Sequence, residues 1–561
     1  MIDNILLKFG SSPTTSALNI ELTPITIFVG PNNSGKSKVL REIESFTRKS
    51  ISQSSDVIVS NINFTAYSLG EIQGEISEIL QTPNPGENVE LGEIIIGKVG
   101  VQDNTAKRIQ INEADLLREA QAPKGRLWDY NKFLDLYTLR LDGTNRLTLL
   151  SEQSAGDLQQ TPQNHLSYLF INNSVREEVR RIVYEAFGKY YVIDPTKIGR
   201  FRVRLSDKEP KSEREEKGWE TESVQFHNAA TEITLASDGV RAFSGIITTL
   251  LAGDPKITLL DEPEAFLHPS LATKLGKEIG NSLRSSKKRL FASTHSANFL
   301  MGCIQSGAPL NIVRLTYKNG ISTARLLSKD KILHLMKHPL LRSTGVLNGL
   351  FFESVVVCEA DSDRAFYQEI NERLIAQNDS RGITNCLFIN AQNKQTVWDI
   401  VKPLRELGIP AVGIVDIDVL KDGGQVFAKP LEGAFIPNLN HQNFQNQRQV
   451  ILNAFTNTNK NMKRDGGINI LPPSDKEATE NFLNQLRDYG VFVVKNGELE
   501  SWLKFLNATG HGSNWLINIF ELMGENPEDS TYLKPGDGDV WNFIGEINTW
   551  ISNPNRKGIP N

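Results

Sequence analysis

Short apolar runs that end in polar residues recur along this chain, and stretches with helical spacing separate them. The apolar runs lie at Ile25 to Val29 and within KITLLDEP (256–263), KRLFASTHS (288–296), ESVVVCEADSD (353–363) and PAVGIVDIDVL (410–420). Apolar residues recur at helical spacing at 38–46, 175–187 and 396–407. This alternation predicts an α/β fold with parallel sheets in both halves of the chain.

The length of 561 residues exceeds what one hydrophobic core normally serves, so we expect at least two domains. The loop-like stretch KHPLLRSTG separates a first domain, 1–340, from a second, 350–561 that ends in helices. Within the first domain we expect an inserted dimerisation or helical region at about 90–200. The charge run at 208–222 mixes both signs, which is typical of a solvated hairpin or loop.

Composition narrows the functional classes. Apolar residues make up 39% and charged residues 23% of the chain, and the net charge is -5, so the bulk charge does not indicate nucleic-acid binding, although a local basic groove stays open. The three cysteines, Cys303, Cys358 and Cys386, lie too far apart for a zinc motif. No long apolar stretch occurs, so we expect a cytoplasmic protein without a membrane partner.

A glycine-rich loop follows the first apolar run. Gly30, Gly35, Lys36 and Ser37 match the pattern GxxxxGK[ST], and Asn32 and Asn33 lie inside it. Backbone N–H groups of such a loop surround phosphate oxygens, the lysine reaches the outer phosphates, and the serine hydroxyl binds Mg²⁺. The pattern between a strand and a helix favours an ATP site over a structural turn.

Two later strands carry matching polar ends. Asp261 and Glu262 follow the run ITLL, where ligands of α/β sheets bind. Asp261 is suited to hold Mg²⁺, and Glu262 to orient and polarise the attacking water as a catalytic base. His295 ends the next strand and is expected to contact the γ-phosphate, although a lone histidine is more often structural.

The stretch LASDGVRAFSGIITTLLAG completes this set and resembles the signature motif of ABC-type ATPases. In that family the signature serine and glycine, here Ser237 and Gly239, contact ATP bound to a second protomer. The resemblance therefore implies an ATP-dependent homodimer. The form DEPEAFLHP is closer to ABC ATPases of DNA repair, chromosome maintenance and phage defence than to transporters.

A second group of acidic residues follows residue 350. Glu359 ends one expected strand, and Asp361 or Ser362 is expected to cap the next helix. Asp416 and Asp418, two positions apart, are expected on one side of a strand. Carboxylates buried together need a cation, and oxygen ligands favour Mg²⁺ or Mn²⁺. The alternative for the first segment is a helix-capping sequence without a metal.

Together these segments resemble the Toprim domain of OLD (overcoming lysogenization defect) nucleases, a family that includes Gabija and retron effectors. VFVVKNGELESWL (491–503) is similar to its later acidic turn, which makes Glu498 and, better, Glu500 metal ligands. The implied ligand set is Glu359, Asp363, Asp416, Asp418 and Glu500. The family also uses a late basic residue, for which Lys504 is the nearest candidate. Lys394 is an alternative phosphate contact, and His511 is expected to be a loop or surface residue.

The resemblance implies an ATP-regulated, Mg²⁺-dependent DNA endonuclease of antiphage defence that assembles as a dimer or tetramer. It also implies a partner such as a helicase, or a reverse transcriptase with non-coding RNA or DNA. We expect ATP to hold the ATPase domains together and restrain cutting. Two alternatives stay open: an ATPase sensor or scaffold with a degenerate Toprim domain, and a repair factor that binds DNA ends without cutting.

Overall fold

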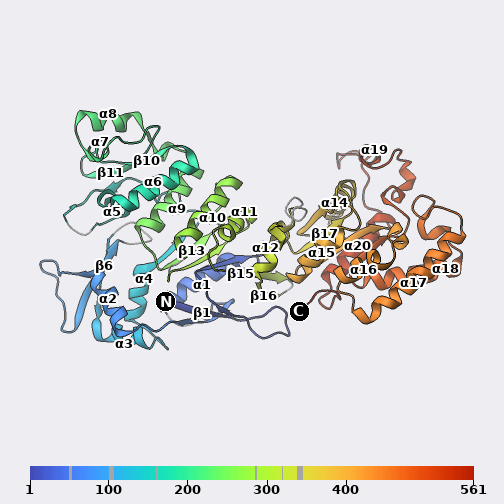
Figure 1. Ribbon diagram of the computed structural model, residues 1–561, viewed down its shortest axis with the longest axis horizontal. Helices are drawn as coiled ribbons and strands as arrows, with labels where there is room; N and C mark the ends of the chain where they lie inside the picture. The colour runs from blue at the N-terminus through green and yellow to red at the C-terminus, as the bar shows by residue number, and fades with distance from the viewer. Residues whose placement is uncertain are drawn as a thin grey trace. The chain divides into compact units, whose positions relative to one another are not determined.

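The computed structural model describes residues 1–49, 53–99, 106–159, 162–284, 287–318, 320–337 and 345–560. These residues form two compact units, Met1–Lys329 and Asp330–Asn561 (Figure 1). The division therefore lies before residue 340, where the sequence predicted the first domain to end. Over the described ranges, no helix combines the length and apolar character that a bilayer span requires.

A six-stranded sheet in the order β16-β15-β3-β14-β13-β8 is the centre of the first unit. Its strands are β3 (Ile25–Val29), β8 (Thr138–Leu141), β13 (Ile257–Asp261), β14 (Arg289–Ser293), β15 (Leu310–Lys318) and β16 (Ile321–Leu327). All pairs are parallel except β15 with β16. Every residue of β3 is buried, as expected for a parallel strand covered on both faces.

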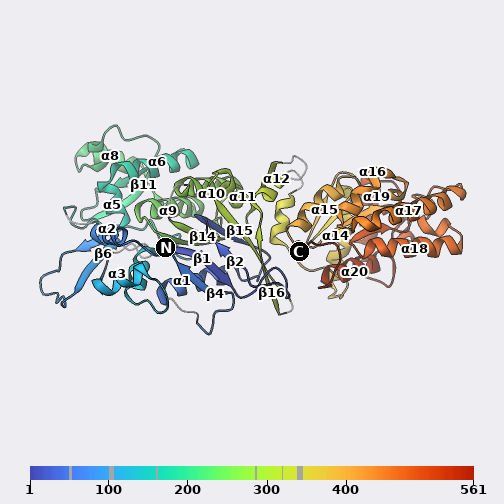
Figure 2. The ribbon, with the colours of Figure 1, turned by 60° about the horizontal axis from the view of Figure 1, so that its bottom comes forward.

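Helices cover both faces of this sheet. Figure 2 shows α10 and α11 on one side and α1 on the other. The covering helices are α1 (Lys36–Lys49), α9 (Asp238–Ala252), α10 (Pro269–Leu283) and α11 (Ala297–Gln305). Val39, Leu40 and Ile43 of α1 lie in one core cluster with Phe28 of β3 and Ile5 of a neighbouring sheet. The apolar face of α1 thereby fixes the end of the glycine loop that precedes it.

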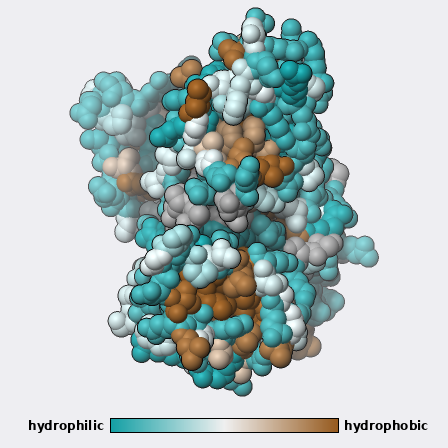
Figure 3. Space-filling model, turned by 90° about the vertical axis from the view of Figure 1, so that its left-hand side faces the viewer, coloured by the Kyte–Doolittle hydropathy of each residue, from teal (hydrophilic) through white to brown (hydrophobic). Residues whose placement is uncertain are grey.

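Three smaller sheets flank the centre of the first unit, in the orders β2-β1-β4, β5-β6-β7 and β10-β11-β12, with β9 paired to β11. Their strands are β1 (Ile2–Leu7), β2 (Asn19–Glu21), β4 (Val59–Phe64), β5 (Leu80–Gln81), β6 (Glu93–Val99), β7 (Ala106–Asn112), β9 (Gln153–Ser154), β10 (Tyr190–Asp194), β11 (Arg200–Ser206) and β12 (Thr231–Glu232). The associated helices are α2 (Leu69–Ile79), α3 (Glu113–Gln121), α4 (Asp129–Tyr137), α5 (His165–Ile171), α6 (Asn173–Phe187), α7 (Glu213–Lys217), α8 (Thr221–Ala229) and the 3-10 helix η1 (Ile233–Leu235). The region at about 90–200 thus includes β8, a strand of the central sheet. Figure 3 shows the face of the first unit that lies on the left in Figure 1. This face is mostly hydrophilic and carries local apolar patches.

The second unit contains a four-stranded parallel sheet in the order β18-β17-β19-β20. Its strands are β17 (Ser354–Cys358), β18 (Cys386–Asn390), β19 (Ala411–Asp416) and β20 (Val491–Val494). The helices are α12 (Lys329–Lys337, which begins at the unit boundary), α14 (Asp361–Ala376), α15 (Val397–Glu406), α16 (Gly424–Gly433), α17 (Asn438–Asn457), α18 (Pro473–Arg487), α19 (Ser513–Met523) and α20 (Asp539–Ser552), with 3-10 turns η2 (Val346–Phe351), η3 (Ile417–Lys421), η4 (Gly467–Ile470), η5 (Leu499–Ser501) and η6 (Lys504–Leu506). Because β17 is followed by β18 on one side and β19 lies on its other side, the strand order reverses between β17 and β19. Ligand sites of α/β sheets form at such a reversal.

The charge run at 208–222 corrects one expectation. Instead of forming only a solvated loop, it contains α7, whose Glu216 is buried. The Glu216 carboxylate pairs with Arg176 at 3.2 Å and with Arg180 at 2.5 Å. Most residues of the run are exposed, as expected, but the run also supplies Glu216 to a buried ion-pair network with two arginines of α6.

Candidate functional sites

The glycine loop has the conformation that a phosphate-binding loop requires. Gly30 has φ +146°, and a Cβ there would lie 2.1 Å from the carbonyl oxygen of Leu315. Gly35 has φ +93°, and α1 begins at the next residue. The ammonium of Lys36 donates to the carbonyl oxygens of Gly30 at 2.9 Å and Pro31 at 2.7 Å. Burial lowers the pKa of Lys36 to about 8, and an incoming phosphate offers this cation a charged partner.

The polar ends of two central strands, β13 and β14, meet beside this loop. The Ser37 hydroxyl donates to Asp261 Oδ1 at 2.8 Å, and Ser293 at the end of β14 donates to the same oxygen. The structure therefore brings together Ser37 and Asp261, which the sequence predicted to hold Mg²⁺. Ser293 was missed, although it ends the strand that precedes His295.

Glu262 and His295 also lie together, with His295 Nε2 3.6 Å from Glu262 Oε1. Burial, followed by the charge of Lys36, lowers the pKa of His295, so the imidazole is neutral near pH 7. The backbone N–H of His295 donates to Glu264 Oε1 at 2.8 Å. Burial raises the pKa of Glu264, which sequence analysis had passed over. Its position, two residues after Glu262 in the same segment, could have predicted that Glu264 belongs to the site.

The signature segment begins α9. Ser237 is the N-cap residue, and its side chain makes no capping hydrogen bond. A Cβ at Gly239 would lie 2.7 Å from the carbonyl oxygen of Phe266, so a side chain there would push the start of α9 away from the segment that carries Phe266. Ser237 is exposed, as a residue that contacts a second protomer must be. The role of both residues in ATP binding stays a prediction.

The acidic cluster of the second unit lies at the reversal of strand order. The backbone N–H of Asp416, the last residue of β19, donates to Glu359 Oε1 at 2.9 Å. Burial and the charge of Asp416 raise the pKa of Glu359 to about 8, and burial and Asp416 raise that of Asp363 to about 7. Three predicted ligands from two segments far apart in the sequence therefore lie close together in one buried place. Near pH 7 burial therefore favours the protonated form of Glu359, and a cation would compete with that proton.

The start of α14 differs from the expectation. Ala360 is the N-cap residue, in place of Asp361 or Ser362. Asp363 Oδ2 accepts the N–H of Ala360 at 3.2 Å, which orients its carboxylate toward the cluster. Asp361 instead pairs with Arg364 at the surface, at 2.7 Å. The helix-capping interpretation therefore applies to Asp363, and its role as a metal ligand stays a prediction.

Asp418 requires a further correction. The expected strand ends at Asp416, and Asp418 lies in η3, so the two carboxylates are not successive residues on one side of a strand. Asp418 Oδ2 lies 3.4 Å from Lys394 Nζ, which also lies 3.1 Å from Asp422. The side chain of Lys394 thus pairs with the rim of the acidic cluster. Asp418 still contributes to the raised pKa of Glu359.

Lys463 also contacts the cluster, and sequence analysis missed it. Its ammonium lies 2.8 Å from Asp416 Oδ2 and 3.8 Å from Glu498 Oε2. Burial alone would lower the pKa of Lys463, but the charge of Asp416, the hydrogen bond to it and the charges of Asp418 and Glu359 together raise the pKa. Lys504, the residue expected in this role, is exposed in η6. Its catalytic role remains a prediction from the resemblance.

Glu498, Glu500 and His511 form a group whose ligand atoms all lie within 4.8 Å of one another. His511 Nδ1 is 2.5 Å from Glu500 Oε1, which also accepts the N–H of Gly512 at 2.8 Å. Burial and the charge of Glu500 raise the pKa of Glu498. His511 lies in an exposed loop, as expected, and nevertheless contacts an acidic residue.

The residues present suit a hard divalent cation. Glu359, Asp363 and Asp416 offer carboxylate oxygens at the strand ends, and Glu498 and Glu500 offer two more in the group that also contains His511. Burial raises the pKa of Asp416, and Lys463 Nζ lies where a cation neutralises it. Buried carboxylates together are costly without such compensation, and oxygen ligands favour Mg²⁺ or Mn²⁺.

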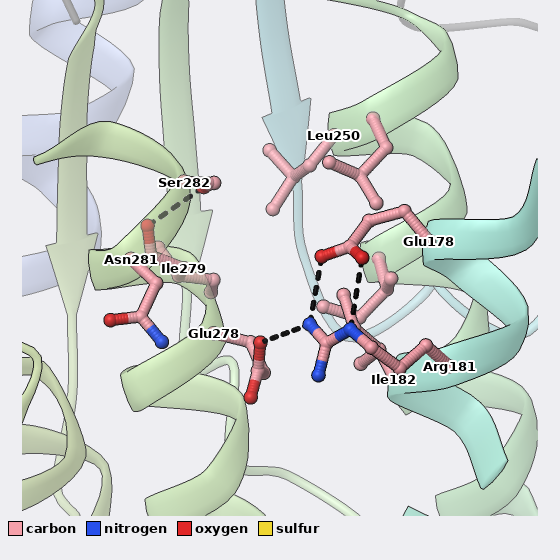
Figure 4. Close-up of a pocket in the computed structure, with 10 residues that line it drawn as sticks. Glu178, Arg181, Ile182, Leu250, Glu278, Ile279, Asn281 and Ser282 are labelled. Atoms are coloured by element: carbon pink, nitrogen blue, oxygen red, sulfur yellow. Dashed lines mark hydrogen bonds and ion pairs between the residues drawn. The ribbon is translucent and has the colours of Figure 1, made fainter. Parts of the chain in front are cut away.

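Neither site coincides with the pocket in Figure 4, which lies between α6, α9 and α10 of the first unit. Arg181 spans this pocket, 2.7 Å from Glu178 and 3.3 Å from Glu278. None of the predicted site residues lines it. The candidate site residues of both units therefore lie near the ends of strands and not in this pocket.

Comparisons with known proteins agree with this division. Residues 25–301 match the family model of an AAA domain named for the AbiEii toxin of type IV TA systems. Residues 350–418 match that of the overcoming lysogenization defect protein-like TOPRIM domain. The Old nuclease of Escherichia phage P2 is 23% identical over 261 residues, 44% of this chain and 43% of that protein.

Solved structures that resemble the chain include an SmcHead bound to the C-winged helix domain of ScpA, at a TM-score of 0.34 and 13% identity, over 59% of this chain and 99% of that one. The SMC head domain from Thermotoga maritima gives a TM-score of 0.29 and 15% identity, over 58% and 99%. The two domain matches lie in the order in which the two sites occur along the chain. By these two matches and the Old nuclease relative, the chain is similar to the OLD family, in which a P-loop ATPase domain is fused to a Toprim domain.

Proposed function

We propose that this protein is a divalent-metal-dependent DNA endonuclease whose cutting is controlled by ATP and that it acts in antiphage defence. The observation that carries the proposal is the buried contact between Glu359 and Asp416 at the strand reversal. An ATPase alone has no use for this second carboxylate cluster. The similarity to a protein named as a nuclease supports the same chemistry.

Glu359, Asp363, Asp416 and Glu500 would hold the cations, with Glu498 beside them. A divalent ion supplies a Lewis acid to phosphate oxygens and stabilises the charge that develops during phosphodiester hydrolysis. The carboxylates first have to lose the protons that burial favours. Lys463, already paired with Asp416, places a further positive charge where a substrate phosphate would meet the cluster.

In the first unit, Lys36 and the loop N–H groups would bind the ATP phosphates, and Ser37 with Asp261 would hold Mg²⁺. Glu262 would accept the proton of the attacking water beside the neutral His295. Ser237 and Gly239 would contact the nucleotide of a second protomer. ATP-bound protomers would then stay paired and restrain cutting, and nucleotide depletion would release it.

The test is the conversion of supercoiled plasmid to nicked or linear DNA in Mg²⁺ or Mn²⁺. We expect cutting by the wild-type protein and loss of cutting in Glu359→Gln and Asp416→Asn. Asp361→Asn is the matched control, because this exposed carboxylate pairs with Arg364 outside the cluster. Equal cutting by all three variants would contradict the proposed site.

A second function is an ATP-driven sensor or scaffold whose Toprim domain binds without cutting. It is favoured by the lysines that already neutralise the cluster, Lys463 at Asp416 and Lys394 at Asp418. Absence of plasmid cutting with either metal, with and without ATP, combined with retained DNA binding, would support this alternative.

A further inference from the structure

The backbone of Glu262 has a conformation that a residue with a side chain rarely adopts. Its φ is +51°, in the left-handed region. Its N–H donates to the carbonyl oxygen of Ser293 at 2.9 Å. Its own carbonyl oxygen accepts the N–H of Ala265 at 2.9 Å. Such a conformation persists only where surrounding contacts hold it, and it often occurs at functional sites.

One of those contacts comes from a distant part of the sequence. Arg146 Nη1 donates to the carbonyl oxygen of Glu262 at 2.5 Å. Arg146 is 2% exposed, and its Nε donates to the carbonyl oxygen of Asp142 at 2.8 Å. The rigid planar guanidinium therefore joins two backbone carbonyls, which a flexible lysine does less well.

The segment that carries Arg146 is itself held from two sides. It follows β8, which pairs in parallel with β13, the strand that ends just before Glu262. On the other side, Arg241 of α9 donates to the carbonyl oxygen of Leu147 at 2.7 Å. A Cβ at Gly245 of α9 would lie 3.2 Å from the carbonyl oxygen of Arg146, so helix and segment are in close contact.

We propose that Arg146 is a positioning residue for ATP hydrolysis. It holds the Glu262 peptide in its left-handed conformation, so that the carboxylate faces His295 and the attacking water. This inference rests on the proposed role of Glu262. In that reaction the water oxygen bonds to the γ-phosphorus and its proton passes to Glu262. The bond from this phosphorus to the bridging oxygen breaks, which releases ADP and phosphate.

Steady-state ATP hydrolysis by the full-length protein tests the proposal. For Arg146→Met we expect kcat to fall roughly 10- to 100-fold with KM changed less than about threefold, since the binding groups stay in place. Arg146→Lys should lose less. Glu262→Gln should lose more, and the double variant Glu262→Gln/Arg146→Met should fall no further than Glu262→Gln, because a positioning residue acts only through its partner.

Two measurements distinguish a positioning role of Arg146 from a general loss of protein stability. Binding of a fluorescent ATP analogue should be unchanged in Arg146→Met. Arg176→Met is the matched control, because Arg176 is equally buried but pairs with Glu216 of α7. We expect it to lower the melting temperature while kcat stays within about twofold of wild type, since it does not touch Glu262.

Three results would overturn the inference: an Arg146→Met kcat within about twofold of wild type, a further multiplicative loss in the double variant, or a wild-type protein that hydrolyses no ATP with or without DNA. DNA cutting is measured separately. A protein that hydrolyses ATP in an Arg146-dependent way but never cuts DNA would leave this inference standing and remove the proposed nuclease.

Discussion

The ammonium of Lys463 lies 2.8 Å from Asp416 Oδ2, so the carboxylate at the end of β19 already has a positive partner. A divalent cation that binds Asp416 has to share this carboxylate with Lys463. The two positive charges repel each other across a partly buried site.

Replacing Lys463 should therefore strengthen metal binding and weaken cutting. For Lys463→Met we expect the Kd for Mn²⁺ to fall by roughly three- to tenfold, since removing one nearby charge contributes about 1 kcal/mol at a partly exposed site. Plasmid cutting should fall, because the positive charge at the phosphate is lost. Isothermal titration with Mn²⁺ measures the first effect. The exposed Lys504→Met is the control, and an unchanged Kd in Lys463→Met would refute the competition.

Metal binding to the cluster should depend on pH near neutrality. The pKa values of about 8 for Glu359 and about 7 for Asp363 mean that the folded protein holds more protons than the unfolded chain above about pH 5. Without metal, these protonated groups therefore stabilise the folded state at low pH. This contribution is lost as the pH rises from about 5 toward 8. Cations compete with those protons, so the affinity for Mn²⁺ should rise at least about tenfold from pH 6 to pH 8.

Thermal unfolding with and without Mn²⁺ checks this pH dependence. The increase in melting temperature caused by the metal should be larger at about pH 8 than at about pH 6. In Glu359→Gln, which cannot release that proton, the difference between the two pH values should shrink. A metal effect that is independent of pH in the wild type would contradict protonated carboxylates in the cluster.

Gly497 should be essential for placing Lys463. Its φ is +126°, and a Cβ there would lie 2.1 Å from the carbonyl oxygen of Lys463. Gly497→Ala should lower the free energy of unfolding by about 1–3 kcal/mol and displace the lysine. Gly536→Ala is the control, because nothing lies within 4 Å of a Cβ at that position. Urea unfolding curves and Mn²⁺ titration measure the two effects.

Lys36→Ala should uncouple cutting from ATP. The variant loses the cation that contacts the phosphate loop, so we expect ATP affinity to fall at least about tenfold. Plasmid cutting should then be equal with and without ATP, whereas ATP should restrain the wild type. Lys38→Ala on the same helix is the control, because that side chain pairs with Glu42 at 3.8 Å. A wild type indifferent to ATP would remove the proposed regulation.

Much of the fold follows from local pattern. β3 begins and ends where the apolar run Ile25 to Val29 predicted, and β13, β14, β17 and β19 lie within the other four runs. Parallel strands buried on both faces produce continuous apolar runs, and polar residues at their ends mark the edge where ligands bind. Asp261, Glu359 and Asp416 were predicted in this way, and Ser37 was predicted from the glycine-loop pattern.

The residues that were missed reach their sites through tertiary contacts. Lys463 lies between α17 and η4, and the close approach of its backbone to Gly497 brings it to the cluster. Arg146 reaches Glu262 because β8 joins the central sheet. Asp418 was misplaced because a period of two holds only while the strand continues, and this strand ends at Asp416.

The carboxylates at the second sheet come from parts of the chain that the ribosome makes at different times. Glu359 and Asp416 are made well before β20 and the turn that carries Glu498 and Glu500. A ribosomal product released early would thus contain the first carboxylates without the last, and the cluster would be incomplete.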